Sequence, residues 1–338
     1  MKKTAVVILN YNGAQMLRDF LPSVIGFSPE AEVVVADNAS TDESVEVMRR
    51  EFPDVRLLQL DRNYGFADGY NHALRQVDAE YYLLLNSDVE VTCGWLAPML
   101  SFMDANSDVA ACQPKLLSYK EKAMFEYAGA AGGFLDLYGY PFCRGRIFDA
   151  VEQDNGQYDS IADLFWATGA ALMIRSDDYW SAGGLDGTFF AHMEEIDLCW
   201  RLRARGRRIV CVPQSVVYHV GGATLDKSNP RKTFLNFRNN LLMLYKNLPA
   251  DELDSVMFRR ALLDYVAAFK FLVSGNLPDF KAVINARREY AKIRPQYAGK
   301  RAENLEKGVC RNIPERSGFS ILWQYYARGR KQYDKLPK

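Results

Sequence analysis

The sequence lacks the cysteine patterns that hold a zinc ion or cross-link a small secreted domain. Its six cysteines, at positions 93, 112, 143, 199, 211 and 310, form no CxxC pair and follow no regular spacing, so we expect reduced thiols. Long apolar runs are also missing: the best candidate, residues 261–273, contains Asp264 and Lys270, whereas a spanning helix needs about 20 apolar residues. The apolar stretch at residues 5–9 is too short for a signal peptide. These absences predict a cytoplasmic protein.

The chain has no net charge, but its charges are divided unevenly. Residues 1–226 hold 19 Lys and Arg against 32 Asp and Glu, a net charge of −13, whereas residues 227–338 hold 23 against 10, a net charge of +13. A basic tail on an acidic body suggests contact with an anionic surface, such as the inner face of a cell membrane. Docking of the tail on its own acidic body, or a homodimer built through the tail, would explain the same division. No nucleic-acid partner is expected.

Strand-like and helix-like segments alternate from Thr4 to about Asp108. Apolar runs predict strands at 4–9, 32–36, 55–60 and 81–85, and amphipathic periods predict helices at 14–27, 41–51, 66–76 and 94–105. This alternation predicts an α/β domain with a Rossmann-like, doubly wound and mostly parallel sheet. The Ser40-Thr41-Asp42-Glu43 sequence is expected to form a capping box for the second helix.

The alternation fades between about residues 118 and 163, where Gly- and Tyr-rich sequence predicts loops and short strands that shape a pocket. Further periodic segments follow: an apolar run at 164–174, a helix at 194–205, a buried strand at 209–212, and helices at 233–246 and 252–271. We place a domain boundary near Asp226. The chain should then consist of an α/β domain at residues 1–226 and a basic, mainly helical extension at residues 227–338.

Two of the predicted strands run into acids. Asp37 directly follows the strand at 32–36, and Asp88 lies three residues after the strand at 81–85. Because the carboxyl ends of parallel strands open into the ligand crevice of an α/β sheet, these acids predict a site for a metal-bound phosphate compound. Asp88 suits Mg²⁺ or Mn²⁺, and Asp37 could accept a hydrogen bond from the N3–H group of uracil or thymine. A turn or helix-capping aspartate is the alternative at both positions.

A second group of acids opens the predicted helix at 194–205. Glu194, Glu195 and Asp197 lie in its first turn, where acids are favourable through the helix dipole alone. Three acids together also suit a general base, which needs a carboxylate that faces a cleft. His219 follows an apolar run and could complete a metal shell as a neutral imidazole. A lone histidine at a strand end is, however, more often structural.

Seven short motifs occur in order along the chain, six of them within residues 4–247 and the last ending at residue 249. They read VILNYN at 7–12, DNASTD at 37–42, NYGF at 63–66, LNSD at 85–88, EEIDL at 194–198 with Arg201 and Arg203, RNN at 238–240, and KNLP at 246–249. Taken together, this ordered set resembles family 2 glycosyltransferases of the GT-A fold, in particular the rhamnosyltransferase-like branch of bacterial surface-polysaccharide enzymes. The resemblance implies that residues 1–226 form a GT-A catalytic domain.

The resemblance implies an inverting, metal-dependent transfer of a sugar from a UDP- or dTDP-linked donor to a hydroxyl group of a glycan or a lipid-linked acceptor. Asp37 would recognise the nucleotide base, and Asp88 and His219 would bind Mg²⁺ or Mn²⁺. Glu195 would be the catalytic base, and Glu194 would orient it or contact the acceptor. The resemblance also implies a further set of residues that bind the nucleotide sugar: Asn10, Asn12, Asn63, Gly65, Phe66, Asn71, Asn86 and Ser87.

Two positions depart from the family pattern. Asn86 stands where the first acid of a DxD motif is usual, so more of the metal binding would depend on His219. Glu195 stands where aspartate is usual, and its longer side chain leaves the choice of base between Glu194 and Glu195 open. A sugar-phosphate nucleotidyltransferase is an alternative, but the loop at residues 10–15 has one glycine and no cation to hold a triphosphate. A catalytically inactive carbohydrate-binding relative is the other alternative.

Overall fold

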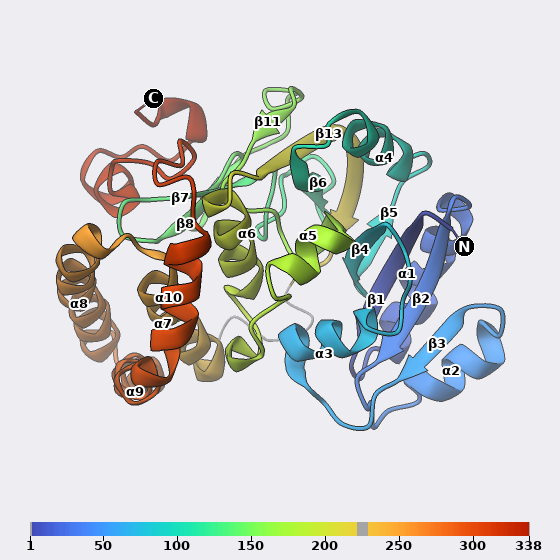
Figure 1. The fold of residues 1–338 in the computed structure, drawn as a ribbon, viewed down its shortest axis with the longest axis horizontal. Coiled ribbons are helices and arrows are strands. Elements are labelled where there is room, and N and C mark those ends of the chain that lie inside the picture. The colour runs from blue at the N-terminus through green and yellow to red at the C-terminus, as the bar shows by residue number, and fades with distance from the viewer. Residues whose placement is uncertain (1, 222–228, 338) are drawn as a thin grey trace.

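In the residues that the structure describes, the centre of the molecule is a nine-stranded sheet (Figure 1). The computed structural model describes residues 2–221 and 229–337, so the boundary predicted near Asp226 lies outside the described residues. The strands lie across the sheet in the order β11 (Ala162–Asp163), β13 (Arg208–His219), β6 (Val109–Ser118), β12 (Ala171–Arg175), β4 (Tyr81–Asn86), β1 (Thr4–Asn10), β2 (Ala31–Asp37) and β3 (Arg56–Gln59), and β5 (Val89–Val91) pairs with β13.

The amino-terminal strands β3, β2, β1 and β4 form a parallel unit, and β1 and β4 are buried along almost their whole length. In this unit Asn10 pairs with Asp37, and Leu9 pairs with Asn86. The carboxyl ends of β1, β2 and β4 therefore meet at one edge. β13 points the same way, because β12 is antiparallel to both β4 and β6 while β6 is parallel to β13. His219, the last residue of β13, thus reaches the same edge.

Helices cover the sheet, and all of them except α5 and η1 lie where the sequence predicts a helix. They are α1 (Ala14–Phe27), α2 (Ser44–Glu51), α3 (Gly65–Leu74), α4 (Leu96–Ala105), α5 (Ser176–Ser181) and α6 (Glu194–Ala204), with a short 3₁₀ turn η1 (Gly187–Phe189) before α6. The alternation predicted up to residue 105 is confirmed, and the ends of its elements differ from the prediction by three residues at most. The sheet is mixed rather than purely parallel, because β5, β11 and β12 pair in an antiparallel manner.

The predicted capping box at residues 40–43 is wrong. Helix α2 begins at Ser44, and no side chain caps it from the preceding residue. Instead, Asp42 accepts hydrogen bonds from the backbone N–H groups of Ser44 (3.0 Å) and Ala14 (3.1 Å). Ser40 accepts one from the N–H of Asn12 (2.9 Å). The segment therefore ties the loop after β2 to the loop after β1, which fixes the two loops beside the carboxyl edge of the sheet.

The predicted irregular region contains a second, smaller sheet. Its strands are β10 (Ala150–Val151), β9 (Arg146–Ile147), β8 (Pro141–Cys143) and β7 (Gly133–Leu135), in that spatial order. Each is only two or three residues long and all pairs are antiparallel. The expectation of loops and short strands between 118 and 163 is confirmed.

The carboxyl-terminal part is mainly helical, as predicted, and packs against the side of the α/β body (Figure 1). Its elements are α7 (Pro230–Asn247), α8 (Ala250–Val273), α9 (Leu277–Ile293), η2 (Arg294–Tyr297), α10 (Ala298–Lys307), η3 (Trp323–Ala327) and η4 (Tyr333–Lys335). Helix α7 lies innermost, since its residues 239–244 are buried, and α9 packs against both α7 and α8. None of the described helices is both long and apolar enough to cross a bilayer.

Candidate active site

A cavity of about 180 Å³ lies at the carboxyl edge of the central sheet. Its lining includes six residues predicted from the sequence: Phe66, Asn86, Asp88, Glu194, Glu195 and His219. These residues come from α3, the end of β4, the start of α6 and the end of β13. The fold thus brings the expected metal ligands and the expected acids to one cavity.

His219 joins two buried carboxylates in this region. Its Nε2 atom lies 3.1 Å from Asp88 Oδ1 and 3.4 Å from the amide nitrogen of Asn86. On the other side of the ring, Nδ1 forms an ion pair with Glu126 Oε2 at 3.3 Å. Burial alone would lower the pKa of His219, but Asp88 and Glu126 outweigh it and raise the pKa to about 10. The imidazole is therefore charged at neutral pH and holds the two carboxylates in place.

Asp37 lies at the same edge, at the end of β2, which β1 separates from β4. It is almost fully buried, and its Oδ1 accepts a hydrogen bond from the Asn10 side chain at 3.1 Å. Its Oδ2 accepts one from the backbone N–H of Ser40 at 2.9 Å. Each carboxylate oxygen can accept more than one hydrogen bond, so these contacts fix the orientation of Asp37 and leave acceptor capacity for a ligand.

The other predicted donor-binding residues stabilise the loops around this edge. Asn12 Oδ1 accepts from the N–H of Thr41 at 2.7 Å, and Asn63 Oδ1 accepts from the N–H of Gly65 at 2.8 Å. Gly65 has φ of +73° and packs so closely on the Phe190 ring that a Cβ would lie 2.5 Å from it. Only glycine therefore fits this turn.

Asn71 and Ser87 lie outside the cavity lining, as do Asp37, Asn10, Asn12, Asn63 and Gly65. Both side-chain groups of Asn71 are engaged inside the protein, since its nitrogen donates to the carbonyl of Leu185 at 2.7 Å and its oxygen accepts from Tyr179 at 2.7 Å. Asn71 therefore anchors the turn before η1. Ser87 is half-buried beside Gly13, on the loop after β1.

Glu194 and Glu195 are adjacent acids in a largely buried setting. Among the described residues, neither Glu194 Oε2 nor Glu195 Oε2 has a hydrogen-bond partner. Burial, followed by the charge of Glu195, raises the pKa of Glu194 well above its ordinary value. Burial raises the pKa of Glu195 to about 7. Burial therefore favours the protonated form of Glu194, and Glu195 titrates near neutral pH.

These raised pKa values predict that the acid pair destabilises the fold as the pH rises. The folded state retains protons that the unfolded state releases above about pH 4.5, so the free energy of unfolding falls between that pH and about 7. Glu194→Gln should raise the free energy of unfolding by on the order of 1 to 3 kcal/mol near pH 8 and by much less near pH 5. Urea denaturation at both pH values would measure this. The exposed Glu46→Gln is the control, and an equal effect in both variants would contradict the prediction.

The segment before α6 has an unusual backbone. Phe190, His192 and Met193 have φ values of 64°, 71° and 73°, a region that costs a non-glycine residue on the order of 1 to 3 kcal/mol. The side-chain nitrogen of Asn239 holds this segment, because it lies within 2.9 Å of the carbonyl oxygens of Phe189, Ala191 and His192. Asn239 of α7 thereby sets the position at which the acidic helix begins.

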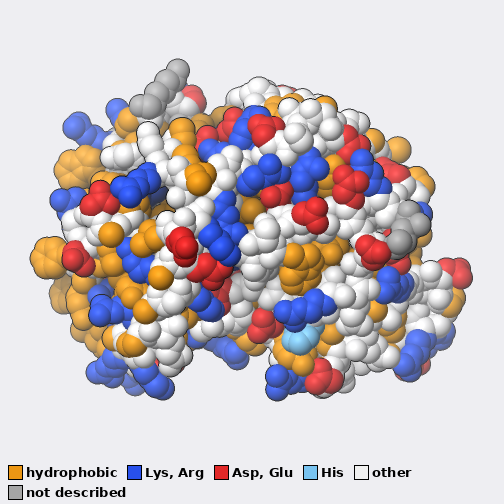
Figure 2. All heavy atoms as spheres, viewed as in Figure 1, with side chains coloured by type: hydrophobic (Ala, Val, Ile, Leu, Met, Phe, Trp, Pro, Cys, Tyr) orange, Lys and Arg blue, Asp and Glu red, His pale blue; other side chains and the backbone are white. Residues whose placement is uncertain are grey.

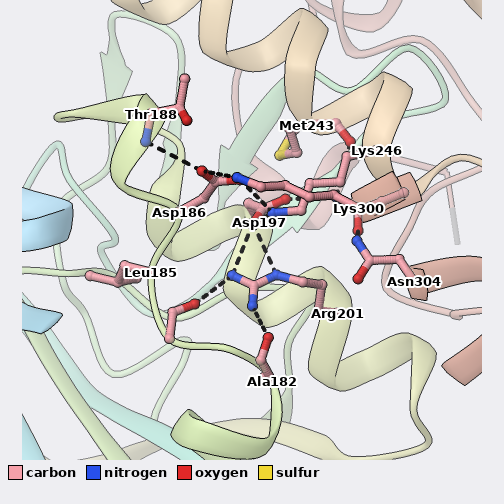
Figure 3. Close-up of polar contacts among 12 residues, drawn as sticks. Ala182, Leu185, Asp186, Thr188, Asp197, Arg201, Met243, Lys246, Lys300 and Asn304 are labelled. Atoms are coloured by element: carbon pink, nitrogen blue, oxygen red, sulfur yellow. Dashed lines mark hydrogen bonds and ion pairs between the residues drawn. The ribbon is translucent and has the colours of Figure 1, made fainter. Parts of the chain in front are cut away.

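A buried ion-pair network fixes α6 against the carboxyl-terminal helices (Figure 3). Lys246 of α7 lies 2.8 Å from Asp197 and 2.9 Å from Asp186. Asp197 is fully buried and also pairs with Arg201 at 3.0 Å. Burial alone would raise the pKa of Asp186, but the charges of Lys246 and Lys300 outweigh it and hold that pKa below its usual range. Asp197, the third acid of the EEIDL motif, is therefore a structural anchor.

Comparison with known proteins identifies the α/β body. Residues 5–140 match the family model described as glycosyl transferase family 2. These residues belong to glycosyltransferase family 2. The resemblance inferred from the motifs is thereby confirmed.

The family 2 domain is similar to bacterial proteins whose names refer to O-antigen biosynthesis and to rhamnosyl transfer. An O-antigen biosynthesis protein, RfbC, of Myxococcus xanthus is 27% identical over 222 residues, which is 64% of this chain and 17% of that much longer protein. An N-acetylglucosaminyl-diphospho-decaprenol L-rhamnosyltransferase of Mycobacterium tuberculosis is 26% identical over 231 residues, which is 63% of this chain and 75% of that protein. The similarity to rhamnosyltransferase-like enzymes that the motifs predict is thereby confirmed.

Solved structures confirm the GT-A fold. The structure of GalNAc-T7 with UDP, GalNAc and Mn²⁺ superposes on the whole of this chain and on 59% of its own, with a TM-score of 0.62 and 16% sequence identity. At this identity the likeness concerns the fold alone.

Two charged residues at the site were not predicted from the sequence. Glu126, which pairs with His219, lies in the irregular region, where no period or motif points to it. Lys232 of α7 lines the cavity together with Asp88 and His219, although it is 144 positions from Asp88 in the chain. Lys232 directly precedes the helix predicted at 233–246, and a basic residue at such a position gives no signal of its own. Only the packing of α7 brings it to the site.

Proposed function

We propose that this chain is an inverting glycosyltransferase that moves a sugar from a UDP- or dTDP-linked donor to a hydroxyl group of a glycan or lipid-linked acceptor during cell-surface polysaccharide synthesis. One observation carries the proposal: a single cavity is lined both by Asp88 with His219 and by Glu194 with Glu195. Such a transfer needs a site for the diphosphate and a base within reach of the attacking hydroxyl. The named relatives support the polysaccharide context, and the UDP in the GalNAc-T7 structure supports the donor class.

Asp88 and His219 are the residues that would hold a divalent cation. The Asp88 carboxylate oxygen and the His219 Nε2 atom, 3.1 Å apart, would be suitable ligands for Mn²⁺ or Mg²⁺ once the imidazole has lost its proton, so binding of the cation would displace that proton. In the described part of the chain no three His, Cys, Asp or Glu side chains are arranged as a complete metal site, so diphosphate oxygens and water would supply the other ligands. When bound, the cation would neutralise charge on the departing diphosphate. Glu126 would orient the ring of His219 from its other side.

Glu195 is the better candidate for the base. Its pKa of about 7 leaves a substantial ionised fraction at neutral pH, whereas burial and the charge of Glu195 raise the pKa of Glu194 well above its ordinary value and favour its protonated form. The Glu195 carboxylate would take the proton of the acceptor hydroxyl while the hydroxyl oxygen attacks C1 of the sugar, on the face opposite the diphosphate. Asp37, held by Asn10 and the N–H of Ser40, would accept a hydrogen bond from the nucleotide base.

Calorimetry of UDP and dTDP binding tests the donor site. We expect Mn²⁺ to strengthen nucleotide binding to the natural chain by about tenfold or more, and Asp88→Asn to abolish that gain. Asp37→Ala should weaken nucleotide binding both with Mn²⁺ and with excess chelator, because it removes a contact to the base and not to the cation. Asp54→Asn, at an exposed position, is the matched control. Equal affinity with Mn²⁺ and with chelator would rule out the role given to Asp88.

Product analysis separates the alternatives. A glycosyltransferase should slowly hydrolyse its UDP- or dTDP-sugar and release the nucleoside diphosphate. A carbohydrate-binding relative would bind the same compounds with no turnover, and a sugar-phosphate nucleotidyltransferase would instead release pyrophosphate from a nucleoside triphosphate. Either of these two results would overturn the proposed activity.

A further inference from the structure

One face of α8 leaves large apolar side chains exposed. They are Phe258, Leu262, Tyr265, Val266, Phe269 and Val273. Their spacing places them on one side of the helix, and Phe258, Val266 and Phe269 are 67%, 65% and 63% exposed. Figure 2 shows hydrophobic side chains gathered along the edge of the molecule that α8 forms in Figure 1. We call these six residues the α8 apolar face.

The opposite side of α8 is fixed to the protein by buried charges. Arg260 donates to Asp264 at 3.1 Å and to the carbonyl of Tyr138 at 2.9 Å. Arg287 of α9 donates to the second oxygen of Asp264 at 2.6 Å. Breaking such buried pairs is strongly unfavourable, so α8 cannot turn about its axis to hide its apolar side. The outward direction of the α8 apolar face is therefore set by the fold.

Basic side chains accompany the α8 apolar face. On α8 itself, Arg259 and Lys270 are exposed. The neighbouring helix α9, which packs against α8, has three further exposed cations, Lys281, Arg288 and Lys292. Lys270 also lies over the ring of Tyr326, which with Trp323 adds two exposed aromatic side chains. The exposed acids of α8, Asp251 and Asp254, come before the apolar stripe begins. The surface therefore combines apolar, aromatic and positively charged groups.

We propose that the α8 apolar face inserts into the headgroup region of an anionic lipid bilayer, with α8 lying in the plane of the surface. Helices of this kind bind membranes through apolar side chains below the headgroups and Lys and Arg side chains beside anionic lipids. Trp323 and Tyr326 suit the same boundary, because their rings are apolar with one polar atom. A second copy of the chain would bring a face of the same positive charge against this one, which disfavours a dimer here. The proposal is independent of the donor and base assignments.

Co-sedimentation of the full chain with lipid vesicles tests the proposal. We expect the protein to pellet with vesicles that contain phosphatidylglycerol at low salt, to be partly released at high salt, and to bind phosphatidylcholine vesicles weakly. The double substitution Val266→Ser with Phe269→Ser should weaken binding to the anionic vesicles by about tenfold or more. Val309→Ser is the matched control, because Val309 is 79% exposed but follows α10. Thermal melting would check that both variants remain folded.

Three results would overturn the proposal: equal binding to anionic and neutral vesicles, equal binding by the double variant and the natural chain, or no binding at all. A dimer in solution that the double variant dissociates would show that a second copy covers the α8 apolar face. Because the vesicle assay contains no nucleotide sugar, its failure leaves the proposed transferase activity untouched. Failure of the donor-binding test would likewise leave membrane binding in place.

Discussion

Glu195→Gln is expected to lower turnover by roughly 100-fold or more while nucleotide binding stays nearly unchanged. Glutamine keeps the size and polarity of the side chain but cannot take the proton of the acceptor hydroxyl. Glu194→Gln should have a milder effect, because the raised pKa of Glu194 favours its protonated form, which glutamine resembles. Steady-state rates with saturating donor, together with calorimetry of UDP or dTDP binding, would measure the two effects separately.

The ranking of the two variants decides the assignment. If Glu194→Gln lowers turnover more than Glu195→Gln does, the base is Glu194 and the assignment to Glu195 is wrong. Loss of folding would not explain a low rate, because removing either buried carboxylate should stabilise the protein at alkaline pH. An unchanged rate in both variants would exclude the pair from proton transfer.

Lys246→Met is expected to lower the free energy of unfolding by about 3 to 5 kcal/mol at neutral pH. Methionine fills a similar volume but leaves Asp186 and Asp197 without the buried ammonium group that lies within 2.9 Å of both. Taking one partner from a buried ion pair is costly because the remaining charge is kept away from water. Urea denaturation, followed by tryptophan fluorescence, would measure the change.

Lys300→Met is the matched control for this network. Lys300 contacts the same carboxylate, Asp186, at 2.8 Å, but its side chain is 46% exposed. Exposed pairs contribute about 1 kcal/mol or less. Equal losses in the two variants would contradict the idea that burial makes Lys246 important.

The α/β body could be predicted because its strands are apolar along their length and its helices have a clear amphipathic period. The prediction of a capping box failed because Asp42 and Ser40 accept hydrogen bonds from a neighbouring loop, which a local motif does not reveal.

The orientation of α8 could not be predicted either. By composition Arg260 and Asp264 should face water, but partners from three other segments bury them and turn the apolar side outward.

The site was predictable where its residues belong to motifs at strand and helix ends, as Asp88 and Glu195 do. Glu126 was not, because its role depends on a contact between an irregular loop and the end of β13. Nor did the sequence reveal that Asp197 is an anchor and not a third reacting acid. Its environment is created by Lys246 and Asn247, about 50 positions further along the chain.

The strained segment at residues 190–193 limits how this chain can be recombined with its relatives. Its carbonyl groups are held by the side chain of Asn239, so the loop that leads into the acidic helix is completed by a residue from α7. A chimera that exchanged only residues 227–338 would replace this support and leave the loop unchanged. We expect functional chimeras to require exchange of the loop and α7 together, because Asn239 of α7 holds the loop.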